Sequence, residues 1–374
     1  MKNRRTLVRG FIFFQFFLTA LGVHAQEPSP YWLMLEEGKR QFREGSYGKA
    51  LISFEDSRRI RKESFEKMER TLIDLLSIPE VRRLGDSLGK LEAYISERNQ
   101  AASASALRTL YYQVGKESLK DSSTEALKRI HGLKDFPEAE YWIGEVYLAE
   151  GEYPIALKQF LKVLDLSDRL DTPAFRTEVL YRIADIHAKR REYLEMEKRL
   201  QEIIAADELW NKDTESFIRA AMVRTLSDSG IDRFLTMYRY EYGVSEKAHR
   251  LLGVYYYTSG RHARSVEHLL FSFLIQNTTV LNYLSRVKPE YVFSVFVELS
   301  SSIKEFSGLV DYAREVEYFK TIYYLGASLF AVGKNNAALE IWRVLSVQAN
   351  AGEWKGRAEL QLRKPFIEPV TGKP

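Results

Sequence analysis

A recurring pattern of small and aromatic residues constrains the fold of this chain more than any other feature. Its clearest copy spans residues 139–164, with the sequence AEYWIGEVYLAEGEYPIALKQFLKVL. Gly144 and Ala156 lie where two successive helices would approach closely, and Phe160 fills the wedge between them. Gly151 falls at the end of the first helix, where a left-handed residue is favoured. The pattern therefore predicts a helix–turn–helix unit.

Four further segments repeat this pattern less completely: residues 31–58, 177–204, 246–273 and 319–346. Their small residues on the first helix are Gly38, Ala184, Gly253 and Gly326. The intervals from Ala184 to Gly253 and from Gly253 to Gly326 are 69 and 73 residues, and each accommodates two units of about 34–36 residues. We therefore expect degenerate units in the gaps, which gives about five recognisable units and up to about nine in total.

In residue types and spacing these segments resemble the tetratricopeptide repeat (TPR), a helix–turn–helix unit of 34 residues. The resemblance implies an all-α fold, in which the units stack into a right-handed superhelical solenoid over residues 31–350. It also implies a protein without catalytic chemistry or cofactors, which binds a protein or peptide on the concave face lined by the first helix of each unit. We therefore expect a non-enzymatic interaction scaffold.

Most positions that line the concave face in such repeats are aromatic or charged in this chain. They are Leu35, Lys39, Phe42, Arg43, Tyr141, Glu145, Tyr181, Asp185, Tyr257, Tyr323 and Phe330. Tyrosine offers a large amphipathic contact area, which is typical of recognition surfaces. Two alternatives stay open: the tyrosines pack between adjacent first helices, or the aromatic groove serves an envelope glycan or an envelope-enzyme accessory module.

The N-terminal segment carries the whole positive charge excess of the chain. Residues 1–25 contain four basic residues and no acid, followed within the segment by an apolar run and small residues at Val23 and Ala25. This layout predicts a secretory signal peptide cleaved after Ala25, with an uncleaved membrane anchor as the alternative. Without these four residues, 51 Lys and Arg balance 51 Asp and Glu. The mature chain is therefore neutral, and we expect no nucleic-acid partner.

Residues 138–204 suggest a cellular compartment. The run Glu140-Tyr141-Trp142-Ile143-Gly144-Glu145, followed by Tyr147, is similar to the periplasmic TPR proteins associated with the Tol–Pal envelope system. The N-terminal coiled coil of such proteins is missing here. The resemblance therefore implies an exported, periplasmic protein more than it implies a particular task.

Motifs for catalysis and metal binding are weak throughout the sequence. The chain has no Cys, which excludes thiol chemistry and Cys-based metal sites. His262 and His268 are six residues apart, which does not place two ligands on one helical face, so no metal is expected. The basic run Arg58–Lys62 is interpreted as a solvated helix face.

The predicted organisation has five parts. Residues 1–25 form the signal peptide and residues 26–30 a linker, followed by a helical region with degenerate units over 31–138. Residues 139–350 form the TPR solenoid, and 351–374, with three prolines near the end, form a C-terminal tail. No later apolar run reaches the roughly 20 residues that a transmembrane helix needs.

Overall fold

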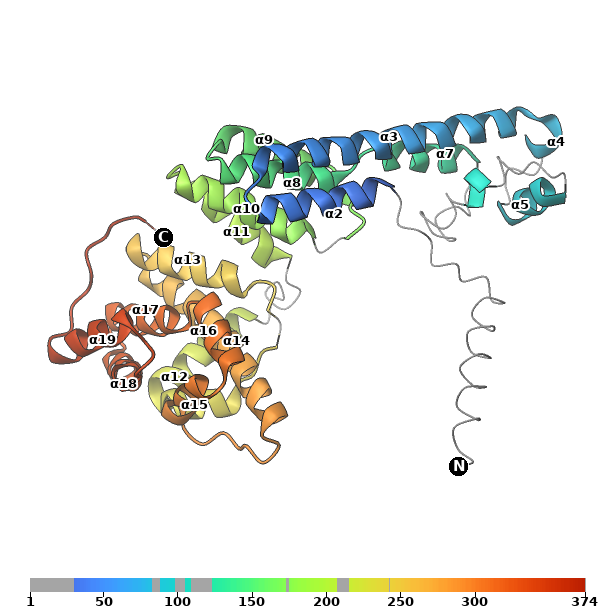
Figure 1. The fold of residues 1–374 in the computed structure, drawn as a ribbon. Coiled ribbons are helices and arrows are strands. Elements are labelled where there is room, and N and C mark those ends of the chain that lie inside the picture. The colour runs from blue at the N-terminus through green and yellow to red at the C-terminus, as the bar shows by residue number, and fades with distance from the viewer. Residues whose placement is uncertain are drawn as a thin grey trace, which may run out of the picture. The chain divides into compact units, whose positions relative to one another are not determined.

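The computed structural model describes residues 30–82, 88–97, 105–108, 123–172, 175–206, 215–241 and 243–373. Every regular element in these ranges is a helix (Figure 1), which confirms the predicted all-α class. The chain divides into two compact units, Met1–Arg176 and Thr177–Pro374. The predicted boundary at residues 138 and 139 therefore lies inside the first unit. The predicted signal peptide lies outside the described residues, as does all of the linker except Pro30.

The first unit is built on one long helix. Its elements are α2 (Pro30–Arg43), α3 (Tyr47–Ser77), α4 (Pro79–Arg82), α5 (Leu88–Glu97), α7 (Ser123–Leu133), α8 (Pro137–Ala149), α9 (Tyr153–Asp165) and the short 3-10 helix η2 (Ser167–Arg169). Helix α3 packs against α2, α7 and α8, and α8 packs against α9. The core between them includes Leu35, Phe54 and Ile143, each with at most 2% of its surface exposed.

The second unit contains the remaining helices, of which α10 begins at Phe175, just before the boundary. They are α10 (Phe175–Lys189), α11 (Tyr193–Ala205), α12 (Glu215–Met237), α13 (Glu246–Thr258), α14 (His262–Val287), α15 (Phe296–Ser302), the 3-10 helix η3 (Ile303–Glu305), α16 (Ser307–Glu315), α17 (Tyr318–Ala331), α18 (Asn335–Ser346) and α19 (Glu353–Arg363). Helix α13 packs against α14, α17 against α18, and α14 against α17. The intervals predicted to hold degenerate units contain α12 and the short helices α15 and α16.

Sequential pairing of helices depends on a small residue that faces a large one 16 residues later. A β-carbon placed on each of four glycines would lie within 3 Å of that large side chain: Gly38 faces Phe54, Gly144 faces Phe160, Gly253 faces Leu269, and Gly326 faces Trp342. Ala184 and Leu200 have the same spacing and are both buried. Only a small side chain allows such close helix packing. The fold is therefore an array of sequential helix pairs, as the sequence pattern predicts.

The turn within each pair also repeats. Seven residues after the small residue, the backbone is left-handed at Gly45, Gly151, Gly260 and Gly333, with φ between 76° and 83°. At the equivalent position after Ala184, Arg191 adopts φ of 62°. A side chain in this conformation costs about 1–2 kcal/mol, which glycine avoids.

The C-terminal region differs from the prediction. Residues 351–374 were expected to form a tail, but Glu353–Arg363 form α19, which packs against α17 and α18. The segment after it, residues 364–373, runs from α19 back to α13 (Figure 1), where Thr371 and Gly372 donate backbone hydrogen bonds to the carbonyl of Thr258. The prediction of a loose tail is wrong because long-range contacts order this proline-containing segment.

Among the helices that the structure describes, none combines the length and apolar character needed to cross a membrane.

Candidate functional site

The eleven predicted binding residues differ widely in burial. Six of them have at most 8% of their surface exposed: Leu35, Tyr141, Glu145, Tyr181, Tyr257 and Tyr323. Four are half-buried, namely Lys39, Phe42, Asp185 and Phe330, and Arg43 is exposed. The burial of the four tyrosines agrees with the packing alternative. Their role as partner contacts stays a prediction.

In the first unit, residues of α2 gather at Trp142 of α8, a residue that the predicted set omits. The ammonium group of Lys39 lies 5.6 Å from the Trp142 ring centroid, and the Phe42 ring lies 5.7 Å from it. Lys39 also pairs with Glu36 at 2.7 Å. Arg43 donates from Nε to the carbonyl of Lys39 at 3.3 Å. These contacts create a mixed cationic and aromatic surface.

Two predicted residues of α8 instead contribute to the interior. Tyr141 packs against Phe160, with 5.4 Å between the ring centroids, and Glu145 is 8% exposed. Both side chains are therefore buried rather than presented on an open surface.

Tyr181 of α10 joins its helix to the start of α13. Its hydroxyl donates to the carbonyl of Val244 at 2.8 Å and accepts from the amide of Ala248 at 3.1 Å. Burial raises the pKa of Tyr181, so the phenol stays protonated and keeps both bonds. Asp185, one turn later, pairs with Lys189 at 3.0 Å. These contacts show that Tyr181 helps to hold α10 against the start of α13.

Tyr257 of α13 and Tyr323 of α17 lie beneath the chain's own C-terminal segment. The Tyr323 hydroxyl donates to Glu368 Oε1 at 2.6 Å, and the Tyr257 hydroxyl accepts from the amide of Glu368 at 3.2 Å. Arg357 of α19 pairs with the same carboxylate oxygen at 2.5 Å. Burial raises the pKa of Tyr257 to about 12, so its hydroxyl remains neutral. The structure thus brings together two predicted residues, on two first helices, around one carboxylate.

Phe330, the last predicted residue, lies near the end of α17. Its ring centroid is 5.9 Å from that of the buried Trp342, and the side chain is half-exposed. It therefore offers a partly accessible aromatic surface on a first helix.

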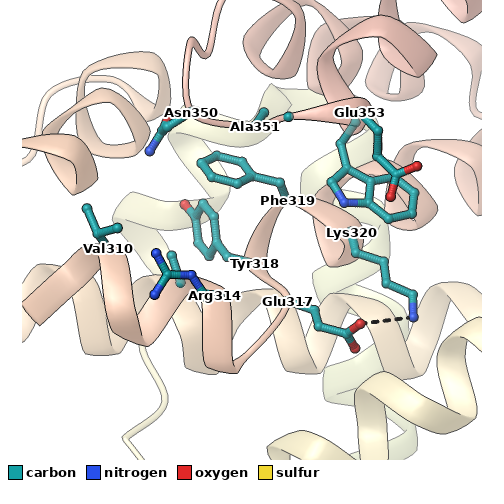
Figure 2. Close-up of a pocket in the computed structure, with 12 residues that line it drawn as sticks. Val310, Arg314, Glu317, Tyr318, Phe319, Lys320, Asn350, Ala351 and Glu353 are labelled. Carbon is teal, nitrogen blue, oxygen red and sulfur yellow. Dashed lines mark hydrogen bonds and ion pairs between the residues drawn. The ribbon is translucent and has the colours of Figure 1, made fainter.

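A separate pocket of 420 Å³ opens in the second unit (Figure 2). It is lined by Val310, Ala313, Arg314, Glu317, Tyr318, Phe319, Lys320, Asn350, Ala351, Gly352, Glu353 and Trp354. Glu317 has a left-handed backbone, with φ of 47°, and its carboxylate pairs with Arg250 and, at 3.2 Å, with Lys320. No sequence motif marks this pocket, because it forms where the turn before α17 meets the turn before α19.

A polar hollow of 880 Å³ lies in the first unit. Arg58 and Lys162 reach the same buried carboxylate there, Glu140, at 3.0 and 2.5 Å. The neighbouring Arg61 is 1% exposed, and its guanidinium lies 4.5 Å from the centroid of the Phe136 ring. It also donates to the carbonyl of Leu133 at 2.9 Å. The prediction of a solvated helix face is therefore wrong for Arg61, which is part of the core.

The second unit also buries two histidines side by side. His249 and His268 approach to 3.1 Å between their Nδ1 atoms. Burial lowers the pKa of both imidazoles, so both are neutral at pH 7. In the part of the chain that the structure describes, no group of three or more His, Asp or Glu side chains is arranged to hold a metal ion.

Comparison with known proteins identifies a relative but no family. No protein-family model matches this sequence. The chain is similar to an uncharacterized protein of Treponema pallidum (strain Nichols), with 22% identity over 347 residues. The alignment covers 91% of each chain, so the likeness extends through both units. It assigns no activity and no partner.

Proposed function

We propose that this chain is an exported, non-enzymatic scaffold of the TPR type in the bacterial cell envelope, and that it binds a protein or peptide on the first helices of its pairs. The observation that carries this proposal is the path of residues 364–373. This extended segment contacts Tyr257 and Tyr323, which lie on two first helices at positions that the repeat pattern assigns to the binding face. The surface can therefore hold a peptide.

The repeat type is supported by the register of each pair. A small residue, a left-handed turn residue seven positions later and a large residue 16 positions later recur along the chain. This register supports stacking of the pairs into a superhelical solenoid, as TPR units do. Export is supported by the layout of residues 1–25, which predicts Gln26 as the first residue of the mature protein.

The proposal is tested by crosslinking in cells from matched positions. A photoreactive residue at Arg43 or Phe330 samples the first helices, and one at Ile52 or Arg343 samples the second helices of the same pairs. All four sites are exposed or half-exposed, so the folded core is left intact. We expect one envelope protein to be captured from the first two sites and not from the other two. Equal capture from all four, or none from Arg43 and Phe330, contradicts the binding face.

A glycan-binding function is favoured by one specific observation, the pocket in Figure 2. Its lining combines the aromatic side chain of Phe319 with the polar groups of Arg314, Asn350 and Glu353. Its volume of 420 Å³ suits a small ligand. Calorimetric titration with N-acetylglucosamine oligomers tests this function. Binding that Arg314→Ala weakens supports it, and absence of heat at millimolar ligand rejects it.

A further inference from the structure

The C-terminal segment is held like a bound peptide. We propose that residues 364–373 are an internal ligand, and that the surface beneath them binds extended partner segments that carry a carboxylate at the position of Glu368. We call this surface the Tyr–Arg face and define it by Tyr257, Thr258, Tyr323, Arg357 and Gln361. The inference rests on the proposed function, because it names the kind of partner that the first helices α13 and α17 accept.

A preformed carboxylate site lies at the centre of the Tyr–Arg face. Arg357 and the Tyr323 hydroxyl both donate to Glu368 Oε1, at 2.5 and 2.6 Å. The Arg357 guanidinium is itself fixed, since it lies 4.5 Å from the Tyr323 ring centroid and 4.9 Å from that of Trp354. Charge-assisted hydrogen bonds to a fixed guanidinium are strong and selective for a carboxylate. The Glu368 side chain is 17% exposed, so this residue is the anchor of the segment.

The other contacts of the segment involve its backbone. Gln361 both donates to the carbonyl of Phe366, at 3.2 Å, and accepts from its amide, at 2.9 Å. The Tyr257 hydroxyl accepts from the amide of Glu368. The carbonyl of Thr258 accepts from the amides of Thr371 and Gly372 at 3.0 and 2.8 Å. Any extended peptide presents backbone amides and carbonyls of this kind. The Tyr–Arg face therefore recognises one carboxylate and an extended backbone.

The large apolar side chains of the segment do not fix it in place. Phe366, Ile367 and Val370 are 47%, 49% and 65% exposed. The segment therefore gains little from apolar burial. A tethered ligand of this kind competes through an effective concentration in the millimolar range, which a partner of higher intrinsic affinity can exceed. The segment is thus a displaceable occupant that keeps the face covered until a partner arrives.

A peptide titration tests the proposal. A fluorescent peptide with the sequence of residues 364–374 is added to the mature full-length protein, and its anisotropy is measured for the wild type and for Glu368→Ala. The variant weakens the internal ligand, so we expect it to bind the peptide at least about tenfold more tightly than the wild type does. Arg357→Ala combined with Glu368→Ala should lose that binding. A peptide with Gln in place of Glu should bind about tenfold more weakly, because the charge-assisted bonds are lost.

A second variant guards against a misfolded first one. A chain that ends at Arg363, the last residue of α19, removes the internal ligand entirely, and circular dichroism checks that its helices are retained. Failure of the peptide to bind both folded variants overturns the proposal, as does equal affinity for the Glu and Gln peptides. Concentration-dependent dimers that Glu368→Ala abolishes would assign the segment to exchange between two copies and overturn its role as an internal ligand.

The outcomes also separate this inference from the scaffold function. Peptide binding without any partner captured from Arg43 or Phe330 would keep the internal ligand and reject the scaffold. Partner capture without peptide binding would keep the scaffold and reject the Tyr–Arg face as a carboxylate reader.

Discussion

The first helices of the two units share one packing pattern but present different surfaces. In the first unit, Lys39 and Phe42 of α2 are half-buried beside Trp142. In the second unit, the corresponding surface of α13 and α17 is covered by a segment of the same chain, anchored by Glu368. Equivalent first helices therefore pack against their second helices in the same way, but the surfaces that they present differ in how exposed they are.

This difference changes how burial is interpreted. Tyr141 packs against Phe160 of its own helix pair and against Phe175 at the start of α10, with 5.4 and 4.6 Å between ring centroids. Tyr323 is 1% exposed, and part of its cover comes from Arg357 of α19 and from Glu368 of the C-terminal segment. Low exposure thus marks packing between helices at Tyr141 and cover by the chain's own C-terminal segment at Tyr323.

The largest effect is expected from removing the large residue of a helix pair. Trp342→Ala in the second unit and Phe54→Ala in the first should each lower the free energy of unfolding by about 3–5 kcal/mol, because each side chain is fully buried against a glycine. Denaturant unfolding followed by circular dichroism measures both values. A loss below about 1 kcal/mol for either variant would show that its pair does not depend on this packing.

The next largest effect is expected from acid, which should lower the stability of the second unit more than that of the first. His249 and His268 lie in the second unit, and burial lowers the pKa of both from 6.5. The unfolded chain then binds more protons than the folded chain below pH 6.5, so stability falls as the pH falls. Between pH 7 and pH 5 we expect a loss of about 2 kcal/mol per histidine.

Hydrogen exchange at several pH values, read out by unit, measures this loss. The side chain of His131 in the first unit is 72% exposed, so that unit provides the internal control. A double variant, His249→Gln with His268→Gln, should flatten the pH dependence of α13 and α14. An unchanged slope in that variant would assign the acid sensitivity to other groups.

A smaller loss is expected where glycine is replaced on a first helix. A β-carbon on Gly326 would lie 2.7 Å from Trp342 Nε1, and one on Gly144 would lie 2.9 Å from Phe160 Cε1. Gly326→Ala and Gly144→Ala should each cost about 1–3 kcal/mol through overpacking. Thermal unfolding tests both, with Gly356→Ala as the control, because nothing lies within 4 Å of its β-carbon position. A control as damaging as the test variants would contradict the packing explanation.

The helix pairs could be predicted from the sequence because their determinants are local. The small residue, the turn residue and the large residue of a pair lie within 16 positions of one another. A short window therefore contains everything that fixes the crossing of the two helices. The same locality explains why the all-α class is confirmed in both units.

The C-terminal segment and the buried Arg61 could not be found in this way. The segment is ordered by contacts with Tyr257 and Thr258, more than 100 residues earlier, while its prolines indicate a tail. Arg61 belongs to a basic run, but Phe54, Arg61 and Phe65 share one helical face at spacings of seven and four. That periodicity indicates that Arg61 faces the core. The buried guanidinium keeps its hydrogen bonds because it donates to the carbonyl of Leu133 and to the carboxylate of Asp171.

The smallest expected effect is a gain in the pair of α10 and α11, which has no glycine at its turn, unlike the four described pairs that turn at Gly45, Gly151, Gly260 and Gly333. Arg191 has φ of 62°, where the other pairs have glycine. Arg191→Gly should raise the free energy of unfolding by about 0.5–1 kcal/mol, because relief of the left-handed strain exceeds the added entropy of the unfolded chain. The reciprocal change, Gly151→Ala in the first unit, should lower it by about 1 kcal/mol. Urea unfolding compares the two. A loss of stability in Arg191→Gly would mean that this turn is held by its side chain, and that the two units do not use the same turn chemistry.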